Sequence, residues 1–264
     1  MKLKDKVAIV TGAGSGMGRA IALGFAGEGA KVLVTDVNRA GGEETVKMIR
    51  DQGREAVFLL TDVSRSEEVQ KMVATAVEKY GKIDILVNNA GVDLLGNSQT
   101  VAEEDWNRTI AVNLTGPFLC AKYAIAKMKE SGGGVIINIA SVEGLSGLSN
   151  QVAYSSSKGG VINLTKCLAI DHARDNIRVN AICPGGIETP MVMDLVNKEG
   201  MEPLKKYLIR QHALRRFGKP EEIAKVAVFL ASDDSSFIIG SHIIADGGWL
   251  CGKSMSTSEI FKGQ

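Results

Sequence analysis

The sequence predicts an α/β protein in which one parallel β-sheet is covered by helices on both faces. Short apolar runs alternate along the chain with stretches of helical periodicity. The runs are apolar at successive positions, which is typical of strands that are buried on both faces. Strand–helix alternation implies right-handed crossovers and a doubly wound sheet. Because a chain of 264 residues can form one such domain and shows no linker or repeat, we expect a single domain over residues 1–264.

The expected strands are short runs of branched apolar residues, and the expected helices begin or end at capping residues or glycines. We expect seven strands, at residues 7–10, 31–35, 55–60, 83–87, 135–140, 177–182 and 243–244. We expect helices at residues 19–29, 40–52, 66–80, 102–130, 152–174 and 221–231. Ser66 is the expected N-cap of the third helix, which stops before Gly81.

The charge balance argues against several classes of partner. Lys plus Arg total 31 and Asp plus Glu total 30, and the longest basic cluster is the pair Arg215–Arg216. A protein that binds nucleic acid usually carries a basic stripe. No apolar run approaches the ~18 residues of a membrane span, and the first residues lack the apolar core and cleavage site of a signal peptide. We therefore expect a cytoplasmic protein with a small-molecule partner and with no nucleic-acid or membrane partner.

The cysteines point in the same direction. The four of them, Cys120, Cys167, Cys183 and Cys251, are scattered, without a CxxC pair or close spacing to a histidine. We expect neither disulfides nor a metal site, as is usual in a reducing cytosol. The first three cysteines fall in apolar stretches, where we expect buried small side chains.

A glycine-rich turn, Thr11–Gly18, lies between the first strand and the first helix, with glycines at positions 12, 14, 16 and 18. Glycine permits positive φ and close approach of a ligand to the backbone. The helix that follows presents free N–H groups and a positive dipole end, which together attract pyrophosphate. The alternative interpretation is a tight turn without a ligand, since a lone glycine pattern is weak.

Asp36 ends the second strand, where a nucleotide-binding βαβ unit places the carboxylate that accepts from the ribose 2′-hydroxyl. The same carboxylate repels a 2′-phosphate, and Val37 offers no cation. We therefore expect NAD rather than NADP. Two alternatives stay open: Asp36 could simply cap the next turn, and Arg39 could reach a 2′-phosphate.

Three residues could perform alcohol chemistry. Tyr154 and Lys158 are four apart on the helix expected at 152–174 and so share a face, and Ser141 follows the fifth strand. A free phenol has a pKa of ~10 and is a poor base near neutrality. The Lys158 ammonium favours the phenolate, as does the charge of an oxidised nicotinamide. Ser141 can donate to the substrate oxygen as negative charge grows on it.

These motifs together resemble the short-chain dehydrogenase/reductase family of about 250 residues, over residues 4–250. The matching segments, in chain order, are TGxxxGxG at 11–18, Asp62–Val63, NNAG at 88–91, Asn113, Ser141, Tyr154, Lys158, Pro184–Gly185, Thr189 and Asp246-Gly247-Gly248. The resemblance implies a Rossmann fold, and an oxidoreductase that acts on an alcohol or ketone with NAD.

The resemblance also implies roles for particular residues. The implied catalytic residues are Asn113, Ser141, Tyr154 and Lys158, with Asn113 holding a water linked to the lysine. The implied cofactor contacts are Gly12, Ser15, Gly16, Met17, Gly18, Asp36, Asp62, Val63, Asn89, Ala90, Gly91, Tyr154, Lys158, Pro184, Gly185, Ile187 and Thr189. The family is usually dimeric or tetrameric through the helices at 102–130 and 152–174 and the last strand, so we expect a homotetramer or homodimer.

The expected substrate pocket lies beside the catalytic groups. Positions flanking the catalytic groups are Asp93, Leu94, Val142, Glu143, Leu145, Gln151, Gly186 and Met191, and we take Glu143, Gln151, Gly186 and Met191 as substrate contacts. A buried carboxylate is costly unless it is hydrogen-bonded. This favours a hydroxyl-rich substrate bonded by Glu143 and Gln151. Alternatively, Glu143 faces solvent or pairs with a lysine.

Four of the five prolines lie within or directly beside the segment 185–219, at positions 184, 190, 203 and 220, and we expect a substrate lid at about 188–217. The tail at 251–264 extends beyond the family pattern and could reach a neighbouring subunit or be disordered.

The sequence leaves three functions to compare. The first is an NAD-dependent oxidoreductase that interconverts a secondary alcohol, such as a polyol, sugar or cyclic alcohol, and its ketone. The second is an NADPH-linked ketoreductase of the 3-oxoacyl type, against which Asp36 argues. The third is a catalytically silent nucleotide-binding scaffold, which would have no need of the four catalytic residues. The fold alone does not choose among them.

Overall fold

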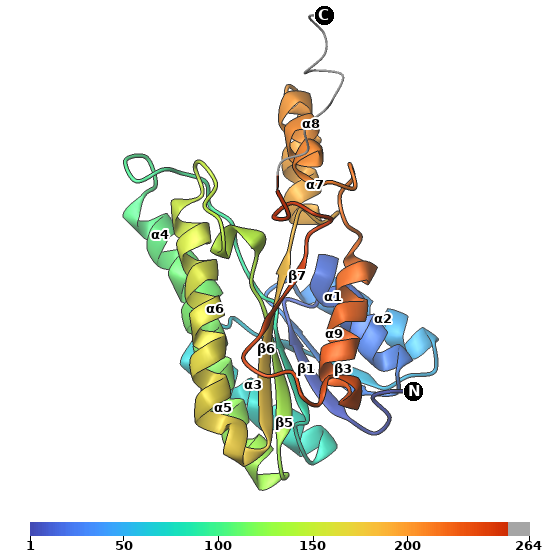
Figure 1. Cartoon of the computed structure of the whole chain (residues 1–264). Helices are drawn as coiled ribbons and strands as arrows, with labels where there is room; N and C mark the ends of the chain where they lie inside the picture. Colours follow the sequence, from blue (N-terminus) through green and yellow to red (C-terminus); the bar gives the residue numbers. More distant parts are fainter. Residues whose placement is uncertain (253–264) are drawn as a thin grey trace, which may run out of the picture.

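The computed structural model describes residues 1–252, so the predicted tail lies outside the described residues except for Cys251 and Gly252. Seven parallel strands form one sheet in the order β3-β2-β1-β4-β5-β6-β7 (Figure 1). Their bounds are β1 Val7–Thr11, β2 Lys31–Asp36, β3 Ala56–Leu60, β4 Ile85–Asn88, β5 Gly134–Ile139, β6 Ile177–Pro184 and β7 His242–Ala245. The predicted doubly wound sheet is confirmed.

Helices cover both faces of the sheet. They are α1 Gly16–Gly27, α2 Arg39–Asp51, α3 Ser66–Tyr80, α4 Glu103–Ile110, α5 Gly116–Glu130, α6 Val152–His172, α7 Pro190–Val196, α8 Glu202–Gln211 and α9 Pro220–Ala231. α1, α2 and α9 pack on one face, and α3, α5 and α6 pack on the other (Figure 1). Along β1, Ala8 and Val10 belong to the first apolar core while Ile9 belongs to the second. This explains why the strands are apolar at successive positions.

The strand order reverses between β1 and β4. The chain runs outward from β1 through β2 to β3, and then returns to place β4 on the other side of β1. The connections that leave the carboxyl ends of β1 and β4 therefore diverge, and the crevice between them is where open α/β sheets bind ligands.

The helical region expected at 102–130 is interrupted. Between α4 and α5, residues Ala111–Thr115 form a π-helical segment. Pro117 has no N–H to donate to the carbonyl of Asn113, four residues earlier, so the regular α-helical ladder cannot continue there. The widened turn places Asn113 in the buried interior.

Three smaller expectations are corrected. Ser66 is the first residue of α3 and Arg65 is the N-cap, and the Ser66 hydroxyl instead lies 2.8 Å from the hydroxyl of Tyr123 on α5. Cys167 is exposed, unlike Cys120 and Cys183, because it lies on the outer face of α6. The first helix begins at Gly16 rather than at residue 19, so the glycine motif itself forms its first turn.

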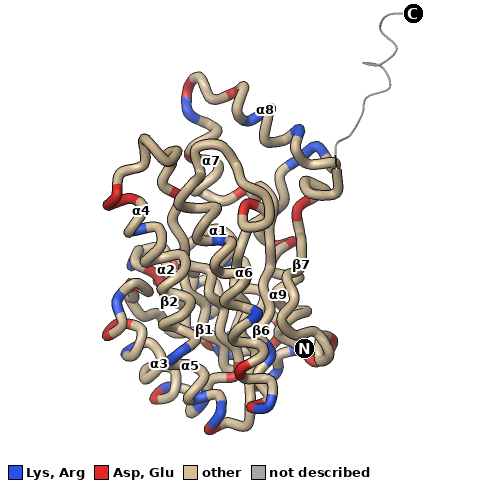
Figure 2. Tube along the Cα trace, turned by 60° about the vertical axis from the view of Figure 1, so that its left-hand side comes forward, with Lys and Arg blue, Asp and Glu red and all other residues tan. Residues whose placement is uncertain are grey.

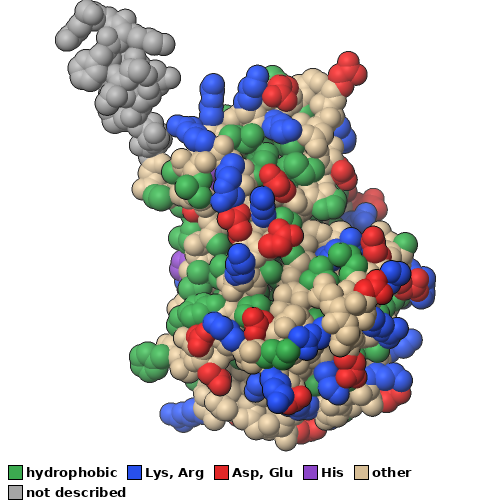
Figure 3. All heavy atoms as spheres, turned by 90° about the vertical axis from the view of Figure 1, so that its right-hand side faces the viewer, with side chains coloured by type: hydrophobic (Ala, Val, Ile, Leu, Met, Phe, Trp, Pro, Cys, Tyr) green, Lys and Arg blue, Asp and Glu red, His purple; other side chains and the backbone are tan. Residues whose placement is uncertain are grey.

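The segment expected to be an irregular lid contains two helices, α7 and α8. Both rise beyond the carboxyl edge of the sheet, above the ends of β6 and β7 (Figure 1). Along the Cα trace, acidic and basic residues are interspersed (Figure 2). The face that carries α9 likewise mixes both signs of charge with apolar side chains (Figure 3). Among residues 1–252, no helix combines the length and apolar character that crossing a membrane requires.

Candidate active site

A cavity of about 450 Å³ follows the carboxyl ends of the central strands. Its lining includes fourteen residues predicted above: Gly12, Ser15, Gly16, Met17, Asp36, Asp62, Val63, Asn89, Ala90, Gly91, Tyr154, Lys158, Thr189 and Met191. Asp36 follows β2, and Lys158 lies on α6 beyond β5. Because β1 and β4 separate these strands in the sheet, the two residues mark opposite ends of the cavity.

The glycine turn is shaped by close approaches. Gly12 has a φ of +61°, and a Cβ there would lie 2.8 Å from the Cα of Ala90. A Cβ on Gly18 would collide with the carbonyl of Gly12. Gly18 lies outside the cavity lining, and its small size serves to pack α1 against β1.

The first turn of α1 faces the cavity without a cap. Ser15 is the N-cap residue, but no side chain accepts from the first N–H groups of the helix. No acidic residue lies in that turn, and Ser15, Gly16 and Met17 line the cavity. Free N–H groups and a positive dipole end are therefore available to an anion such as pyrophosphate.

Asn89 joins the turns that follow β1 and β4. Its side-chain amide donates to the carbonyls of Thr11 at 2.9 Å and Gly12 at 3.0 Å. The Thr11 hydroxyl in turn accepts from the backbone N–H of Asn89 at 3.0 Å and of Ala90 at 3.1 Å. These bonds hold the glycine turn in place while Asn89 and Ala90 line the cavity.

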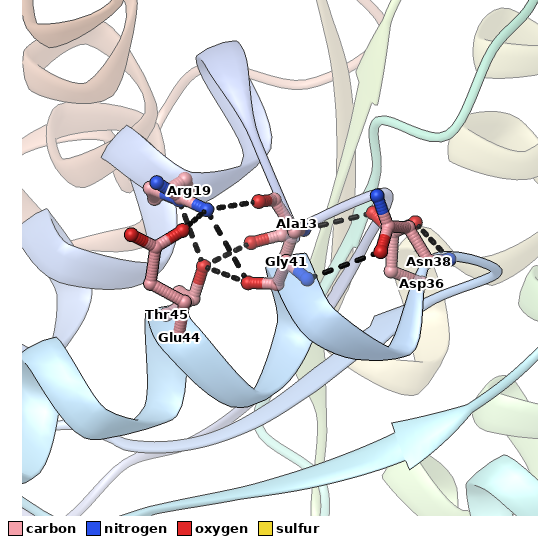
Figure 4. A network of polar contacts seen from close by, with 8 residues as sticks. Ala13, Arg19, Asp36, Asn38, Gly41, Glu44 and Thr45 are labelled. Carbon is pink, nitrogen blue, oxygen red and sulfur yellow. Dashed lines mark hydrogen bonds and ion pairs between the residues drawn. The ribbon is translucent and has the colours of Figure 1, made fainter.

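Asp36 is bonded by the backbone on both oxygens (Figure 4). Its Oδ2 accepts from the N–H of Gly14, and its Oδ1 accepts from the N–H of Asn38, each at 2.8 Å. The turn-capping interpretation is thus correct. It is also compatible with binding, because each carboxylate oxygen has a further lone pair and both Asp36 and Val37 line the cavity.

Two nearby cations are already engaged. Arg19, which the sequence analysis missed, bonds Glu44 at 2.6 Å, the Thr45 hydroxyl at 3.0 Å and the Gly14 carbonyl (Figure 4). Arg39 pairs with Glu43 at 3.2 Å on the exposed surface of α2. Beside Val37, the cavity lining after β2 therefore presents the Asp36 carboxylate rather than a cation.

Lys158 and Tyr154 lie one helical turn apart at the other end. The Lys158 ammonium donates to the carbonyl of Ile139 at 2.8 Å and lies 5.5 Å from the centre of the Tyr154 ring. Burial lowers the pKa of Lys158 to about 8. Ser141 accepts from the N–H of Glu143 at 3.1 Å, which leaves its hydroxyl proton available for donation.

The surroundings of the Tyr154 phenol oppose its ionisation. Burial raises its pKa well above the ordinary value, and the negative charges of Glu143 and Asp93 raise it further, while the Ser141 hydroxyl opposes them. The positive charges expected to favour the phenolate against this cost are Lys158, beside the ring, and a bound oxidised nicotinamide.

Asn113 uses its side chain to hold the loop after β4. Its Oδ1 accepts from the N–H of Val92 and its Nδ2 donates to the Val92 carbonyl, each at 2.8 Å, and Nδ2 also donates to the Ser157 hydroxyl at 3.2 Å. Both Nδ2 protons and one of the two Oδ1 lone pairs are thereby used. A water bound at Asn113 would contact the second lone pair of Oδ1 or the backbone carbonyl, to which Pro117 supplies no N–H.

The expected substrate contacts divide into two groups. Met191 lines the cavity. Glu143 and Gln151 lie beside Tyr154, and Gln151 donates to Asp93 at 3.0 Å. Burial raises the pKa of Glu143 to about 7, with a further contribution from Asp93, so Glu143 does not simply face solvent.

Several predicted residues lie away from the cavity. Pro184, Gly185, Gly186 and Ile187 are outside its lining. Gly186 donates its N–H to Nε2 of the buried His212 at 3.0 Å and, with Ile187, borders a separate hollow. The lining also contains residues that the analysis did not predict, namely Thr61, Ser64, Val92, Arg108, Ala111, Val112, Ile139, Ala140 and Pro190. Most of them lie next to a recognised motif in the sequence, and this adjacency could have identified them as lining residues.

Comparison with known proteins agrees with this geometry. The family model described as "Enoyl-(Acyl carrier protein) reductase" matches residues 12–250. A 3-oxoacyl-[acyl-carrier-protein] reductase of Thermotoga maritima is 41% identical over 94% of this chain and 99% of its own length. Cyclohexanol dehydrogenase of an Acinetobacter strain is 36% identical over 94% and 96%. The crystal structure of levodione reductase has a TM-score of 0.90 and 35% identity over 93% and 98%. The chain therefore belongs to the short-chain dehydrogenase/reductase family of oxidoreductases.

Proposed function

We propose that the protein is an NAD-dependent oxidoreductase that interconverts a secondary alcohol and its ketone. One observation carries the proposal: a single cavity has Tyr154 and Lys158 at one end and Asp36 at the other, with the uncapped start of α1 between them. Ser141 lies buried behind this lining, with its hydroxyl beside the Tyr154 phenol. Relatives named for cyclohexanol and for levodione act on a cyclic alcohol and a ketone, which supports this class of substrate.

The cavity suits a dinucleotide along its whole length. The N–H groups at the start of α1 would bind the pyrophosphate, and Asp36 would accept from the adenosine ribose. Asp62 and Val63 would contact the adenine, and Lys158 the second ribose. The family resemblance assigns the nicotinamide end to Pro184, Gly185, Ile187 and Thr189, of which Thr189 lines the cavity.

When bound, oxidised NAD would supply the hydride acceptor and a positive charge that favours the Tyr154 phenolate. In oxidation, Tyr154 takes the hydroxyl proton of the alcohol while the carbinol carbon loses its hydride, and the C–O single bond becomes the ketone double bond. Ser141 donates to the substrate oxygen and holds it in place. In reduction, the same phenol returns the proton to the oxygen.

A second candidate is an NADPH-linked ketoreductase of the 3-oxoacyl type, favoured by the 41% identical relative. Asp36 and Val37 support NAD instead. The third candidate, a silent scaffold, would not need Lys158 buried beside Tyr154. An absorbance assay with cyclohexanol and the cyclohexanediols separates all three: we expect reduction of NAD to exceed that of NADP by at least about tenfold in kcat/KM. A preference for NADP would favour the ketoreductase, and no turnover of any of these alcohols with either dinucleotide would favour the scaffold.

We also propose that residues 188–217 form a lid on the single domain. Met191 at the start of α7 lines the cavity, and α7 and α8 stand above the carboxyl edge of the sheet (Figure 1). Closure of such a segment would exclude water from the hydride transfer. Limited proteolysis within this segment should slow when NAD is added, and an unchanged rate would count against closure.

We further propose a homodimer or homotetramer. Ile170 on α6 is 79% exposed, and Phe118 on α5 and Ile244 on β7 are each 46% exposed. These apolar side chains lie on the three elements through which assembly is expected, and burying them would favour association. Light scattering should give a molar mass of two or four chains, and Ile170→Glu should shift it downward.

A further inference from the structure

Four polar side chains from three separate segments gather beside Tyr154. Asp93 comes from the loop after β4, Glu143 from the short 3₁₀ turn after β5, and Gln151 and Ser155 from the start of α6. The loop after β4 is held against α6 because Gly96 pairs with Gln151 in an isolated β-bridge. Their proximity is shown by a 3.0 Å bond from the Gln151 amide to Asp93, and by the approach of the Ser155 hydroxyl to Glu143, whose pKa it lowers by hydrogen bonding.

Each of these side chains contains a buried oxygen that makes no hydrogen bond of regular geometry: Asp93 Oδ1, Glu143 Oε2, Gln151 Oε1 and Ser155 Oγ. Gln151 as a whole is only 8% exposed, and its amide nitrogen already serves Asp93. When the carboxyl groups are ionised, the Ser155 hydroxyl is the one donor that these four atoms share, and a single proton cannot satisfy three acceptors. Buried polar atoms in proteins are nearly always paired, and each exception requires an explanation.

The unpaired atoms select one kind of ligand group. When the carboxyl groups are ionised, three of the four atoms are oxygens that only accept hydrogen bonds, and Ser155 can donate or accept. A carbonyl or ether oxygen would face acceptors without a donor of its own. A carboxylate would face the negative charges of Glu143 and Asp93. A hydroxyl both donates and accepts, and so it complements the set.

The positive charge of Lys158 offsets part of the attraction that Asp93 and Glu143 would exert on a cationic ligand. The Lys158 ammonium is close enough to act on both Asp93 and Glu143. An ammonium group on the substrate would bring a second positive charge to the same place. A neutral hydroxyl avoids that repulsion and supplies hydrogen bonds of the kind that water would give to these buried oxygens.

We propose that Asp93, Glu143, Gln151 and Ser155 bind a second hydroxyl group of the substrate, so that the enzyme prefers a diol or polyol to a monohydric alcohol. This inference rests on the proposed alcohol oxidation and adds the substrate class. It separates the protein from relatives whose names specify an acyl-carrier thioester or a monohydric cyclohexanol.

The test compares three sets of alcohols on the wild-type enzyme with NAD, at a pH above the pKa of Glu143. The substrates are cyclohexanol, the 1,2-, 1,3- and 1,4-cyclohexanediols, and the monomethyl ethers of those diols. An ether retains the second oxygen and its size but cannot donate. We expect at least one diol to exceed both cyclohexanol and its own ether in kcat/KM by about tenfold or more.

Variants assign the preference to the cluster. Glu143→Ala and Gln151→Leu should bring the ratio of diol to ether toward one. Glu78→Ala, which removes an exposed carboxylate on α3, is the matched control and should leave the ratio at its wild-type value. Should a cluster variant fail to fold, the wild-type comparison of diol with ether decides alone.

The two proposals fail in different ways. If cyclohexanol and the ethers are oxidised as fast as every diol, the second-hydroxyl site is wrong and the proposed oxidation stands. If no alcohol reduces the dinucleotide, both are wrong. If the variants lower turnover of diols and ethers equally, the cluster is structural and the proposal is overturned.

Discussion

The two ends of the cavity satisfy their polar groups in opposite ways. At the Asp36 end, both carboxylate oxygens accept from backbone N–H groups, and Arg19 is bonded to Glu44 and Thr45. At the Tyr154 end, four buried oxygens make no hydrogen bond of regular geometry, and burial has shifted the pKa values of Tyr154, Lys158 and Glu143. Asp36 is thus paired within the protein, whereas the Tyr154 end keeps polar groups that we propose a substrate to satisfy.

This difference explains what each end can do. A site whose polar groups are already hydrogen-bonded within the protein can bind the same cofactor in every turnover with little reorganisation. A site with unpaired buried groups discriminates strongly between substrates, because the wrong substrate leaves those groups unsatisfied. We therefore assign cofactor preference to the Asp36 end, and reaction and substrate preference to the Tyr154 end.

The largest effect is expected for Lys158→Met. This change removes the ammonium beside Tyr154, so kcat should fall by about 10²–10⁴-fold. Binding at the Asp36 end should survive, so the Kd for adenosine diphosphate should change by less than about threefold. Lys166→Met, an exposed lysine on the same helix, is the control. If Lys158→Met weakened the binding of adenosine diphosphate as strongly as it lowered kcat, the two ends of the cavity would not act independently.

The next effect is expected for Asp36→Asn, which keeps the size of the side chain and removes its charge. Repulsion of a 2′-phosphate should fall, so the ratio of kcat/KM for NAD to that for NADP should drop by roughly 10–100-fold. The preference among alcohols should not change. Asp51→Asn, at the exposed end of α2, controls for a general loss of charge. An altered alcohol preference would contradict the proposal that the Asp36 end governs the choice of cofactor alone.

The smallest effect is expected for Glu143→Gln. A negative neighbour raises the pKa of the Tyr154 phenol, so removing the charge lowers that pKa. Oxidation needs the phenolate and rises with pH, so the rising limb should move to lower pH by a fraction of a unit up to about one unit. Profiles of kcat/KM against pH measure the shift, with Glu78→Gln as the control. A limb that moves to higher pH would contradict the assigned electrostatics.

Local patterns in the sequence made the positions of Asp36 and of the pair Tyr154 and Lys158 predictable. The glycine turn and Asp36 adjoin their strands, and Tyr154 and Lys158 are one turn apart on α6, so short-range spacing placed them correctly. The π-helical segment was also signalled in the sequence, because Pro117 stands four residues after Asn113. The regular helix expected over residues 102–130 does not take this proline into account.

The remaining features depend on contacts between distant segments. The bond between Gln151 and Asp93 joins residues 58 apart in sequence, through loops whose paths no local pattern specifies. The raised pKa of Tyr154 reflects burial and two carboxylates from other segments, which spacing along α6 cannot show. The same applies to Gly186, whose N–H is bonded to His212 rather than facing the cavity.

The central claim is that Tyr154 transfers the proton in the reaction. Its most direct test is Tyr154→Phe, which removes the hydroxyl and keeps the ring, measured by the rate of reduced dinucleotide formation with saturating NAD and alcohol. We predict a fall in kcat of about 10²–10⁴-fold with the Kd for NAD within about threefold of wild type. A variant that turns over at the wild-type rate would contradict the claim.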